Sequence, residues 1–486
     1  MPNPLKTRRS GVILHPTSLP GSQPCGSLGE EGFRWVDWLH SAGFGIWQLL
    51  PLTPVADGSP YNSYSAFAGN PCLIDIAAMA RLGFPSPDSA QTAAGIDVLE
   101  CLHRHFEWLE KHQPQPLWNQ LETFCASQPW LEDFCLFSVL KEVSPTHWVD
   151  WPAPLRNRDP DALGAFAAQH AARIRFHRFV QFIFFTQWQA LKTYANQRNI
   201  LLFGDIPIFV SHDSVDAWRH RDLFKLDADG NPQVVAGVPP DYFSATGQRW
   251  GNPLYDWPRH QRDGFAWWKT RIDHALTLYD TVRIDHFRGF VASWEIPAHE
   301  STAINGRWVE APGDQLFQHL LQDRQSLPLI AEDLGIITAE VVALRKKFGL
   351  PGMKILQFAF DSDGANPYLP HNHTRDSVVY TGTHDNNTTR GWYDTLNPDI
   401  RQRIARYYAQ PQEPMPWPLI KSALASPARW SIVPLQDLLE LDAKHRMNTP
   451  GTTTGNWQWR FEWRQFHDGL ADRMRQLNRL YNRASA

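Results

Sequence analysis

Residues 280–286 read DTVRIDH, a short β-branched run that ends in polar residues. In an extended strand successive side chains point to opposite faces, so Val282 and Ile284 share one face while Arg283 and Asp285 share the other. If the apolar pair packs outward against helices, the charged pair points together into the mouth of a barrel. We therefore predict a buried strand with Arg283 and Asp285 at its carboxyl end, where the arginine keeps the aspartate ionised.

Seven further runs of this kind occur along the chain, and near-continuous hydrophobicity is typical of parallel strands buried on both faces. The eight runs are GVILH (11–15), GIWQLLP (45–51), ILLFGDIP (200–207), DTVRIDH (280–286), LIAED (329–333), MKILQF (353–358), SVVYTGTHD (377–385) and SIVPLQD (431–437). Helix-like amphipathic stretches follow several of them, which favours an α/β fold, a (β/α)₈ TIM barrel, over an open sheet. A chain of 486 residues suggests three domains at about 150 residues each, but such barrels with insertions exceed about 400 residues as one domain.

The spacing of the predicted strands is uneven, and two long gaps predict insertions into one barrel domain that spans residues 1–486. The first gap, approximately residues 70–199, reads mainly as helix and predicts a helical inserted subdomain. The second, approximately residues 208–279, is rich in glycine, proline and aromatic residues and predicts an inserted subdomain of ordered loops covering the cleft. Near the start of the chain, Ser27 and Glu30 have the spacing of a capping box, which predicts the beginning of a helix.

The composition argues against several classes of protein. Lysine and arginine number 46 against 50 aspartates and glutamates, a net charge of −4 without long runs of one sign, so neither a nucleic-acid footprint nor a polybasic membrane anchor is indicated. No apolar stretch is long enough to span a bilayer, and the N-terminus does not read as a signal peptide. The five cysteines form no CxxC pair, which argues against a disulfide framework and a cysteine zinc site. We expect a cytoplasmic protein with no membrane or nucleic-acid partner.

Acidic side chains stand at the carboxyl ends of several predicted strands, where the chemistry of a (β/α)₈ barrel takes place. They are Asp205, Asp285, Glu332, Asp333 and Asp385. Two carboxylates on either side of a glycosidic bond are the arrangement that cleaves it, and a spacing of about 5 Å predicts retention of configuration. A glutamate whose pKa is raised by aromatic walls and nearby carboxylates can protonate the leaving oxygen. The alternative is that strand-end acids form structural ion pairs or cap helices.

Other signals in the sequence are weaker. The 22 tryptophans would supply flat walls for sugars, although core packing is the better expectation for any single one. His371 and His373 lack a third ligand at useful spacing, so a solvated loop is a better interpretation than a metal site. The glycines of residues 451–455 lack the lysine and the strand–helix setting of a phosphate loop. We therefore expect no metal ion and no organic cofactor.

Eight stretches of the sequence carry a resemblance to a known family. They are GVILHPTSLPG (11–21), SPYNSYSAFAGNP (59–71), LLFGDIPIFV (201–210), GVPPDYFSATGQRWGNPLY (237–255), VRIDHFRGF (282–290), IAEDLG (330–335), YTGTHDNNTTRGW (380–392) and RMNTPGTTTGNW (446–457). With them the chain resembles the amylomaltases, or 4-α-glucanotransferases (disproportionating enzymes), of the α-amylase clan. The stretches follow the family's order, and residues 237–255 separate this family from ordinary α-amylases. Too few residues follow the eighth strand for the C-terminal β-sandwich of α-amylases, so we expect none.

The resemblance also implies roles for individual residues. It makes Asp285 the nucleophile, Glu332 the general acid/base and Asp385 the acid that holds the distorted sugar. The implied substrate-binding residues are Ser59, Tyr61, Asp205, Asp241, Phe243, Gln248, Trp250, Arg283, His384 and Asn456. Of these, Phe243 belongs to an aromatic loop, residues 239–250, that would arch over the cleft and act as an apolar lid against water.

The implied activity is the transfer of a segment of an α-1,4-glucan to the 4-OH of an acceptor glucose or glucan by a retaining double displacement. Expected substrates are maltooligosaccharides, amylose and α-1,4-glucans derived from starch or glycogen. Two alternatives stay open at this point. One is an α-1,4-glucan hydrolase that uses the same three acids, and the other is a non-catalytic carbohydrate-binding protein.

Overall fold

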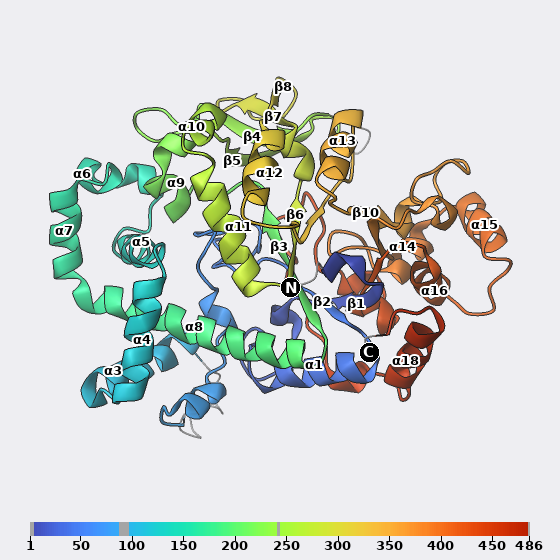
Figure 1. Cartoon of the computed structure of the whole chain (residues 1–486), viewed down its shortest axis with the longest axis horizontal. Coiled ribbons are helices and arrows are strands. Elements are labelled where there is room, and N and C mark those ends of the chain that lie inside the picture. Colours follow the sequence, from blue (N-terminus) through green and yellow to red (C-terminus); the bar gives the residue numbers. More distant parts are fainter. Residues whose placement is uncertain (1–3, 87–96, 241–243, 485–486) are drawn as a thin grey trace.

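A sheet of eight parallel strands forms the centre of the molecule (Figure 1). The structure is a computed structural model that describes residues 4–86, 97–240 and 244–484. The strands lie in the order β10-β11-β12-β1-β2-β3-β6-β9. In chain order they are β1 (Arg9–Ile13), β2 (Ile46–Gln48), β3 (Leu201–Pro207), β6 (Thr281–Asp285), β9 (Leu329–Ala331), β10 (Gly352–Ile355), β11 (Ser377–Tyr380) and β12 (Trp430–Pro434). Each predicted run contains or overlaps one of these strands, so the predicted (β/α)₈ architecture is confirmed.

The two outer strands of this sheet, β9 and β10, are joined by contacts at their ends. The N–H of Ala331 donates to the carbonyl of Pro351 at 2.9 Å, and the N–H of Met353 donates to Asp333 Oδ1 at 2.7 Å. Arg345 Nε lies 3.1 Å from the other carboxylate oxygen of Asp333. These contacts bring the sheet close to a closed barrel, and they give Asp333 a structural role.

Side chains of the barrel strands alternate between the interior and a layer covered by helices. Val282 and Ile284 of β6 belong to the same buried cluster as apolar residues of helices α11 (Ala266–Leu278) and α12 (Gly313–Leu321). Arg283, between them, points the other way and is 4% exposed. The interior is otherwise largely apolar, and its buried cluster includes Ile13, Ile46, Phe203, Ile330, Ile355, Tyr380 and Ile432. The barrel therefore buries Arg283 among apolar neighbours, where it needs acidic partners.

The chain between β2 and β3 forms a group of helices on one side of the barrel, at the left of Figure 1. They are α3 (Val98–His112), α4 (Gln115–Ser127), α5 (Leu131–Val143), α6 (Ala153–Arg156), α7 (Pro160–Gln169) and α8 (Ala171–Gln197). An apolar cluster that includes Phe137 and Trp218 packs α5 against α9 (Val215–Arg219). The long helix α8 returns to β3, and Trp188 Nε1 donates to the carbonyl of Leu278 at 3.1 Å. Helix α8 thus ties this group to the barrel.

A second, antiparallel sheet is built from chain on both sides of β6, in the order β5-β4-β7-β8. Its strands are β4 (Val234–Val238), β5 (Gln248–Pro253), β7 (Ala292–Pro297) and β8 (Arg307–Glu310). The sequence before β6 predicts only ordered loops, so β4 and β5 are not expected from it. Residues 241–243, between these two strands, lie outside the described residues. They include two predicted substrate contacts, Asp241 and Phe243.

Further helices cover the barrel and follow its later strands. They are α1 (Glu30–Ser41), α10 (Trp257–Arg262), α13 (Ala339–Lys347), α14 (Thr389–Thr395), α15 (Pro398–Tyr407), α16 (Trp417–Ala425), α17 (Leu435–Leu438) and α18 (Leu470–Leu480). The predicted capping box at the start of α1 is wrong, because Gly29 is the N-cap residue and Ser27 Oγ donates to Asp75 Oδ2 at 2.6 Å. Within the described ranges, no helix is long and apolar enough to cross a membrane.

Candidate active site

The guanidinium of Arg283 lies inside the barrel and joins two carboxylates. It donates to Asp205 Oδ2 of β3 at 2.6 Å and to Asp285 Oδ1 of β6, also at 2.6 Å. The Asp205 side chain is completely buried, whereas a third of the Asp285 side chain stays exposed. Burial alone lowers the pKa of Arg283, but the two carboxylates raise it well above its ordinary value. The arrangement fixes one oxygen of Asp285 and leaves part of the group open to a ligand.

The carboxyl group of Glu332, directly after β9, is held by the backbone. Its Oε2 accepts the N–H of His286 at 2.7 Å, and its Oε1 accepts the N–H of Leu334 at 2.8 Å. Burial and then the negative charge of Asp285 raise the pKa of Glu332 to about 7, against the opposing effect of Arg283. Glu332 therefore keeps its proton closer to neutral pH than an ordinary glutamate, as a general acid requires.

His286 connects the two acids, because it directly follows Asp285 and donates its backbone N–H to Glu332. Its backbone is left-handed, with φ at 53°, which is uncommon for a residue other than glycine. Its ring packs edge-on against Trp250, with ring centroids 4.8 Å apart. Burial lowers the pKa of His286 to about 4, so the ring is neutral at neutral pH. Sequence reasoning missed this residue, and its position next to Asp285 was the available signal.

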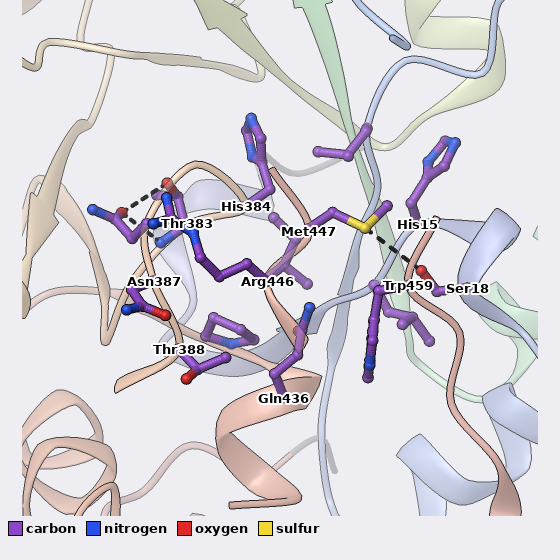
Figure 2. Close-up of a pocket in the computed structure, with 15 residues that line it drawn as sticks. His15, Ser18, Thr383, His384, Asn387, Thr388, Gln436, Arg446, Met447 and Trp459 are labelled. Carbon is purple, nitrogen blue, oxygen red and sulfur yellow. Dashed lines mark hydrogen bonds between the residues drawn. The ribbon is translucent and has the colours of Figure 1, made fainter. Parts of the chain in front are cut away.

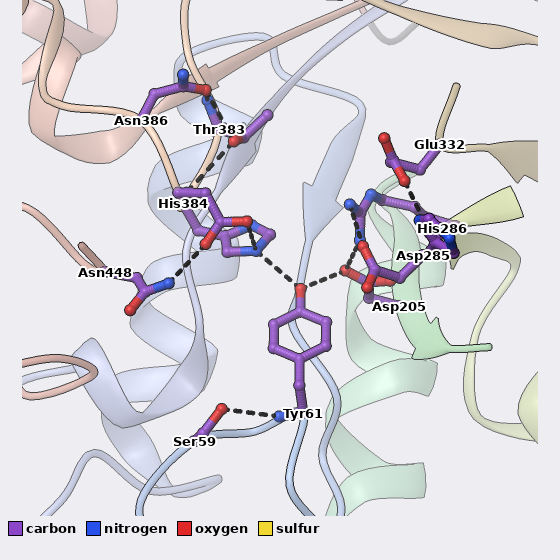
Figure 3. A network of polar contacts seen from close by, with 12 residues as sticks. Ser59, Tyr61, Asp205, Asp285, His286, Glu332, Thr383, His384, Asn386 and Asn448 are labelled. Carbon is purple, nitrogen blue, oxygen red and sulfur yellow. Dashed lines mark hydrogen bonds and ion pairs between the residues drawn. The ribbon is translucent and has the colours of Figure 1, made fainter. Parts of the chain in front are cut away.

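Tyr61 links the Asp205 side of the site to His384 (Figure 3). Its hydroxyl donates to Asp205 Oδ2 at 2.8 Å and lies 2.9 Å from Nε2 of His384. The rings of Tyr61 and His384 are stacked, with centroids 5.4 Å apart and planes 19° apart. Burial and then the charge of Asp205 raise the pKa of Tyr61, so its hydroxyl keeps its proton. Burial likewise raises the pKa of Asp205, with Arg283 opposing and Asp285 adding to the effect.

Asp385 follows His384 after β11 and has two side-chain partners. Asn448 Nδ2 donates to its Oδ1 at 2.7 Å, and His384 Nε2 lies 3.3 Å from its Oδ2. Arg446 donates to the Asp385 backbone carbonyl at 2.9 Å, which fixes the main chain of this turn. Partial burial raises the pKa of Asp385, but His384 and Asn448 outweigh this effect and hold the pKa below its ordinary value. Asp385 is therefore a carboxylate with 44% of its side chain exposed, ready to accept hydrogen bonds from hydroxyl groups.

Two predicted contacts, Gln248 and Trp250, lie on strand β5. Trp250 Nε1 donates to Gln248 Oε1 at 3.1 Å, and the indole is 39% exposed although one edge meets His286. Strand β5 therefore places the Gln248 amide and the exposed Trp250 indole beside His286, the residue that joins Asp285 to Glu332.

The other two predicted contacts lie in turns. Ser59 Oγ accepts the N–H of Tyr61 at 3.3 Å, so Ser59 shapes the turn that carries Tyr61. The Asn456 amide accepts the N–H of Thr449 at 2.9 Å and donates to the carbonyl of Thr452 at 2.9 Å. Asn456 thus closes its own loop, and the next residue, Trp457, lies with its ring centroid 5.9 Å from the rings of both Tyr61 and His384.

The geometry can be compared with known proteins. A model of the 4-alpha-glucanotransferase family matches residues 14–465. The chain belongs to this family. A 4-alpha-glucanotransferase of Thermus thermophilus is 48% identical over 93% of this chain and 94% of its own length. The chloroplastic/amyloplastic 4-alpha-glucanotransferase of Solanum tuberosum is 42% identical over 99% of this chain and 87% of its own length.

Solved structures of amylomaltases share the fold of this family member. The amylomaltase of Streptococcus agalactiae, solved in complex with acarbose, superposes with a TM-score of 0.93 at 37% identity, over 98% of this chain and all of that chain. The amylomaltase of Corynebacterium glutamicum has a TM-score of 0.75 at 17% identity, over 99% of this chain and 76% of that chain, and shows likeness of fold alone. The resemblance drawn from the sequence motifs is confirmed.

Three residues at the site were not predicted from the sequence: His286, Asn448 and Trp457. Asn448 and Trp457 lie in the quoted stretch RMNTPGTTTGNW, where no spacing or period distinguishes them. His286 lies in VRIDHFRGF, where its place next to Asp285 was the one signal. His371 Nε2 donates to the carbonyl of Gly364 at 3.0 Å, and its Nδ1 lies 2.9 Å from the Tyr407 hydroxyl, so His371 has a structural role in its loop. Among the described residues, no cluster of three or more histidines, cysteines and acids is arranged to hold a metal ion.

Proposed function

We propose that the protein transfers segments of α-1,4-glucans by a retaining double displacement, with Asp285 as nucleophile and Glu332 as general acid/base. The observation that carries the proposal is the pairing of these two carboxyl groups through His286, one fixed by Arg283 and the other with a raised pKa. Environments that push the pKa values of two carboxyl groups apart divide the roles of nucleophile and acid between them.

In the first step, a carboxylate oxygen of Asp285 attacks the anomeric carbon of the glucan, and the bond to the departing 4-oxygen breaks. The proton of Glu332 moves to that oxygen, which leaves a β-linked glycosyl ester on Asp285. In the second step, the 4-OH of an acceptor attacks the same carbon, the ester bond breaks, and Glu332 takes the hydroxyl proton. One α-1,4 bond is lost and one is formed, so the number of reducing ends is unchanged.

The residues around the two acids bind the sugar at the cleavage point. Asp385, held ionised beside His384, accepts hydrogen bonds from the hydroxyls of the distorted ring, and these bonds strengthen as the transition state forms. Tyr61 offers a ring face to the sugar. We assign donor-side contacts to Ser59 and Tyr61, and further contacts along the glucan to Asp241, Gln248, Trp250 and Asn456. Asp205, whose side chain is completely buried, acts on the sugar through Arg283 and Tyr61.

Transfer exceeds hydrolysis when water is kept from the glycosyl ester while an acceptor is held in place. We assign this role to residues 239–250, with Phe243 as the apolar lid and the exposed indole of Trp250 as a wall of the acceptor site. Maltooligosaccharides, amylose and α-1,4-glucans of starch or glycogen are the proposed substrates. Five unpaired cysteines and a net charge of −4 support a cytoplasmic location without nucleic-acid or membrane partners.

One experiment tests the function. The protein is incubated with maltotriose while product lengths and total reducing ends are followed together, with Asp285→Asn as the control. Glucose plus a ladder of longer oligomers at constant reducing ends supports transfer. Rising reducing ends would instead assign a hydrolase, and unchanged maltotriose that still binds would assign a carbohydrate-binding protein.

A further inference from the structure

Two of the proposed site acids lie in turns that are held in different ways. In the turn after β11, the N–H and the hydroxyl of Thr383 (Figure 2) both donate to Asn386 Oδ1 at 2.9 Å. The turn that carries Asp385 is thus closed by side chains of its own residues. The turn after β9, which carries Glu332, is instead joined to strand β10 by the side chain of Asp333.

Glu332 is held on its β6 side by the main chain. Its N–H donates to the carbonyl of Ile284 at 3.1 Å, and its carbonyl accepts the N–H of Phe287 at 3.2 Å. Its carboxyl group accepts one N–H from His286 on this side, while the other comes from Leu334, two residues further along its own turn. The place of Leu334 therefore sets one of the two hydrogen bonds of the proposed general acid, and that place depends on the residue between them.

The Asp333 carboxylate fixes this turn from the β10 side. Its Oδ1 accepts the N–H of Met353 at 2.7 Å, where a regular parallel ladder would use a backbone carbonyl of β9. Its Oδ2 lies 3.1 Å from Nε of Arg345 on α13, and only 7% of the side chain is exposed. Arg345 in turn donates to the carbonyl of Leu350, just before β10, at 2.8 Å. One buried carboxylate thus ties the turn that carries the general acid to β10 and to α13.

The fit of this carboxylate requires a glycine on β10. A Cβ atom added to Gly352 would lie 2.3 Å from Asp333 Oδ2 and 2.7 Å from its Cγ, closer than nonbonded atoms approach. Gly352 does not have a positive φ, so the backbone itself would accept alanine. The glycine is therefore required by the Asp333 side chain, which occupies the space that any side chain at position 352 would fill.

We infer that Asp333 is a positioning residue for the general acid. By holding the turn of residues 332–334 against β10, it keeps the Leu334 N–H on the Glu332 carboxyl group, and it keeps that group where the departing oxygen can take its proton. Without the carboxylate the turn loses its attachment to β10, and a misplacement of about 1 Å can cost about 100-fold in rate. This inference rests on the proposed function, because it acts through the role assigned to Glu332.

The test compares two donors that form the same maltosyl ester on Asp285. Maltotriose releases glucose, whose 4-oxygen must take a proton as it leaves, whereas α-maltosyl fluoride releases fluoride with little need of a proton. For Asp333→Ala we expect kcat/KM to fall about 30-fold with maltotriose and less than about threefold with the fluoride. Asp333→Asn keeps an oxygen for the Met353 N–H, so it should restore most of the rate with maltotriose. Equal losses with the two donors overturn the inference.

Gly352→Ala keeps Asp333 but displaces its carboxylate. It should reproduce the difference between the two donors, and it decides the matter if Asp333→Ala does not fold. In the double variant the smaller side chain at position 333 leaves room for the added methyl group. Gly352→Ala should then cost little more in kcat/KM or in denaturant unfolding, and fully additive effects would contradict the inference.

Asp280→Ala is the matched control. Asp280 Oδ2 likewise accepts a strand N–H, that of Leu202 at 2.7 Å, but it does so at the opposite end of β6 from Asp285. Its loss should change kcat/KM for the two donors alike, as a purely structural effect does. If the unmodified protein forms no longer oligomers from either donor, the proposed function fails and the inference fails with it. A working transferase whose Asp333 variants lose both donors alike keeps the function and loses only the inference.

Discussion

The backbone N–H of His286 donates to Glu332 Oε2 at 2.7 Å, so the residue directly after Asp285 holds the proposed general acid. Asp285 ends strand β6 and Glu332 directly follows strand β9, and these two strands are neighbours in the barrel. Their spacing therefore depends on the barrel itself and on one left-handed residue rather than on a flexible loop.

Asp285→Asn should lower transfer from maltotriose by about 10⁴-fold or more, because an amide cannot form the glycosyl ester. The measurement is the appearance of glucose and longer oligomers over time. The Arg283 contact remains available to the amide oxygen, so thermal unfolding should stay close to that of the unmodified protein. Near-normal turnover by a well-folded Asp285→Asn protein would remove this residue from its role.

The pH dependence of kcat/KM should reflect Glu332. The first step needs the protonated acid, and its pKa is raised to about 7 by burial and by Asp285. We therefore expect kcat/KM to fall as the pH rises through about 7, with a slope that approaches one decade per unit. Initial rates across pH 5 to 9 at low maltotriose concentration measure this, and a plateau extending to pH 9 would contradict it.

The same shift predicts a pH-dependent difference in stability. The folded protein binds the Glu332 proton more tightly than the unfolded chain, whose ordinary pKa is 4.5. This contribution is present below pH 4.5 and is lost as the pH rises toward about 7. Glu332→Gln lacks it, so the free energy of unfolding of the unmodified protein should fall relative to the variant across that range. Denaturant titrations at pH 4.5, 6 and 7.5 give the difference, and a difference that does not change with pH would be contrary to the assigned shift.

Much of the barrel could be predicted because its strands are short β-branched runs separated by helical segments. The alternation of residues 281–285 also placed Arg283 and Asp285 on one face, as the contacts of Arg283 show. The strands β4 and β5 could not be predicted in this way. Residues 248–253 read QRWGNP, without alternation and with a glycine and a proline, and they become a strand through pairing with β4, which in turn pairs with β7.

The contacts of the site were less predictable than its acids. Acids at strand ends are visible because a barrel gathers strand ends at one face. A loop that follows the last strand brings Asn448 to Asp385. The two residues are far apart in the sequence, and no helical or strand periodicity relates them. At Ser27 the sequence predicted a contact that does not form. Its local pattern indicated a helix cap, but its hydroxyl instead donates to Asp75, which is distant in the sequence.

Arg283→Lys should impair both stability and turnover. An ammonium is a point donor and cannot hold Asp205 and Asp285 as the guanidinium fork does. The completely buried carboxylate of Asp205 then has a weaker ion pair than with the guanidinium. Removing one partner of a buried ion pair altogether costs about 3–5 kcal/mol, so weakening it costs less. We expect a loss of about 2 kcal/mol in denaturant unfolding and a fall of at least about tenfold in kcat.

Arg483→Met is the matched control for loss of a buried arginine. Arg483 is completely buried and donates to backbone carbonyls, including those of Leu424, Ser426 and Ala428, away from the acids. Arg8 also donates to these three carbonyls, so each keeps one of its two donors in the variant. This variant should lose about 2 kcal/mol of stability and should keep its kcat at temperatures where it is folded. Equal effects of the two variants on kcat would show that the Arg283 result reports stability alone.

Trp250→Ala should raise the share of hydrolysis over transfer. The indole is 39% exposed beside His286, and we propose that it shields the glycosyl ester and carries the acceptor. Its loss admits water and weakens acceptor binding, so reducing ends should rise several-fold faster relative to oligomer formation. Phe243→Ser should act in the same direction if residues 239–250 form the proposed lid.

The control is Trp308→Ala, because Trp308 is 38% exposed on β8 of the same sheet but stacks on Arg288. A ratio that is unchanged in Trp250→Ala, or changed equally in Trp308→Ala, would remove Trp250 from water exclusion.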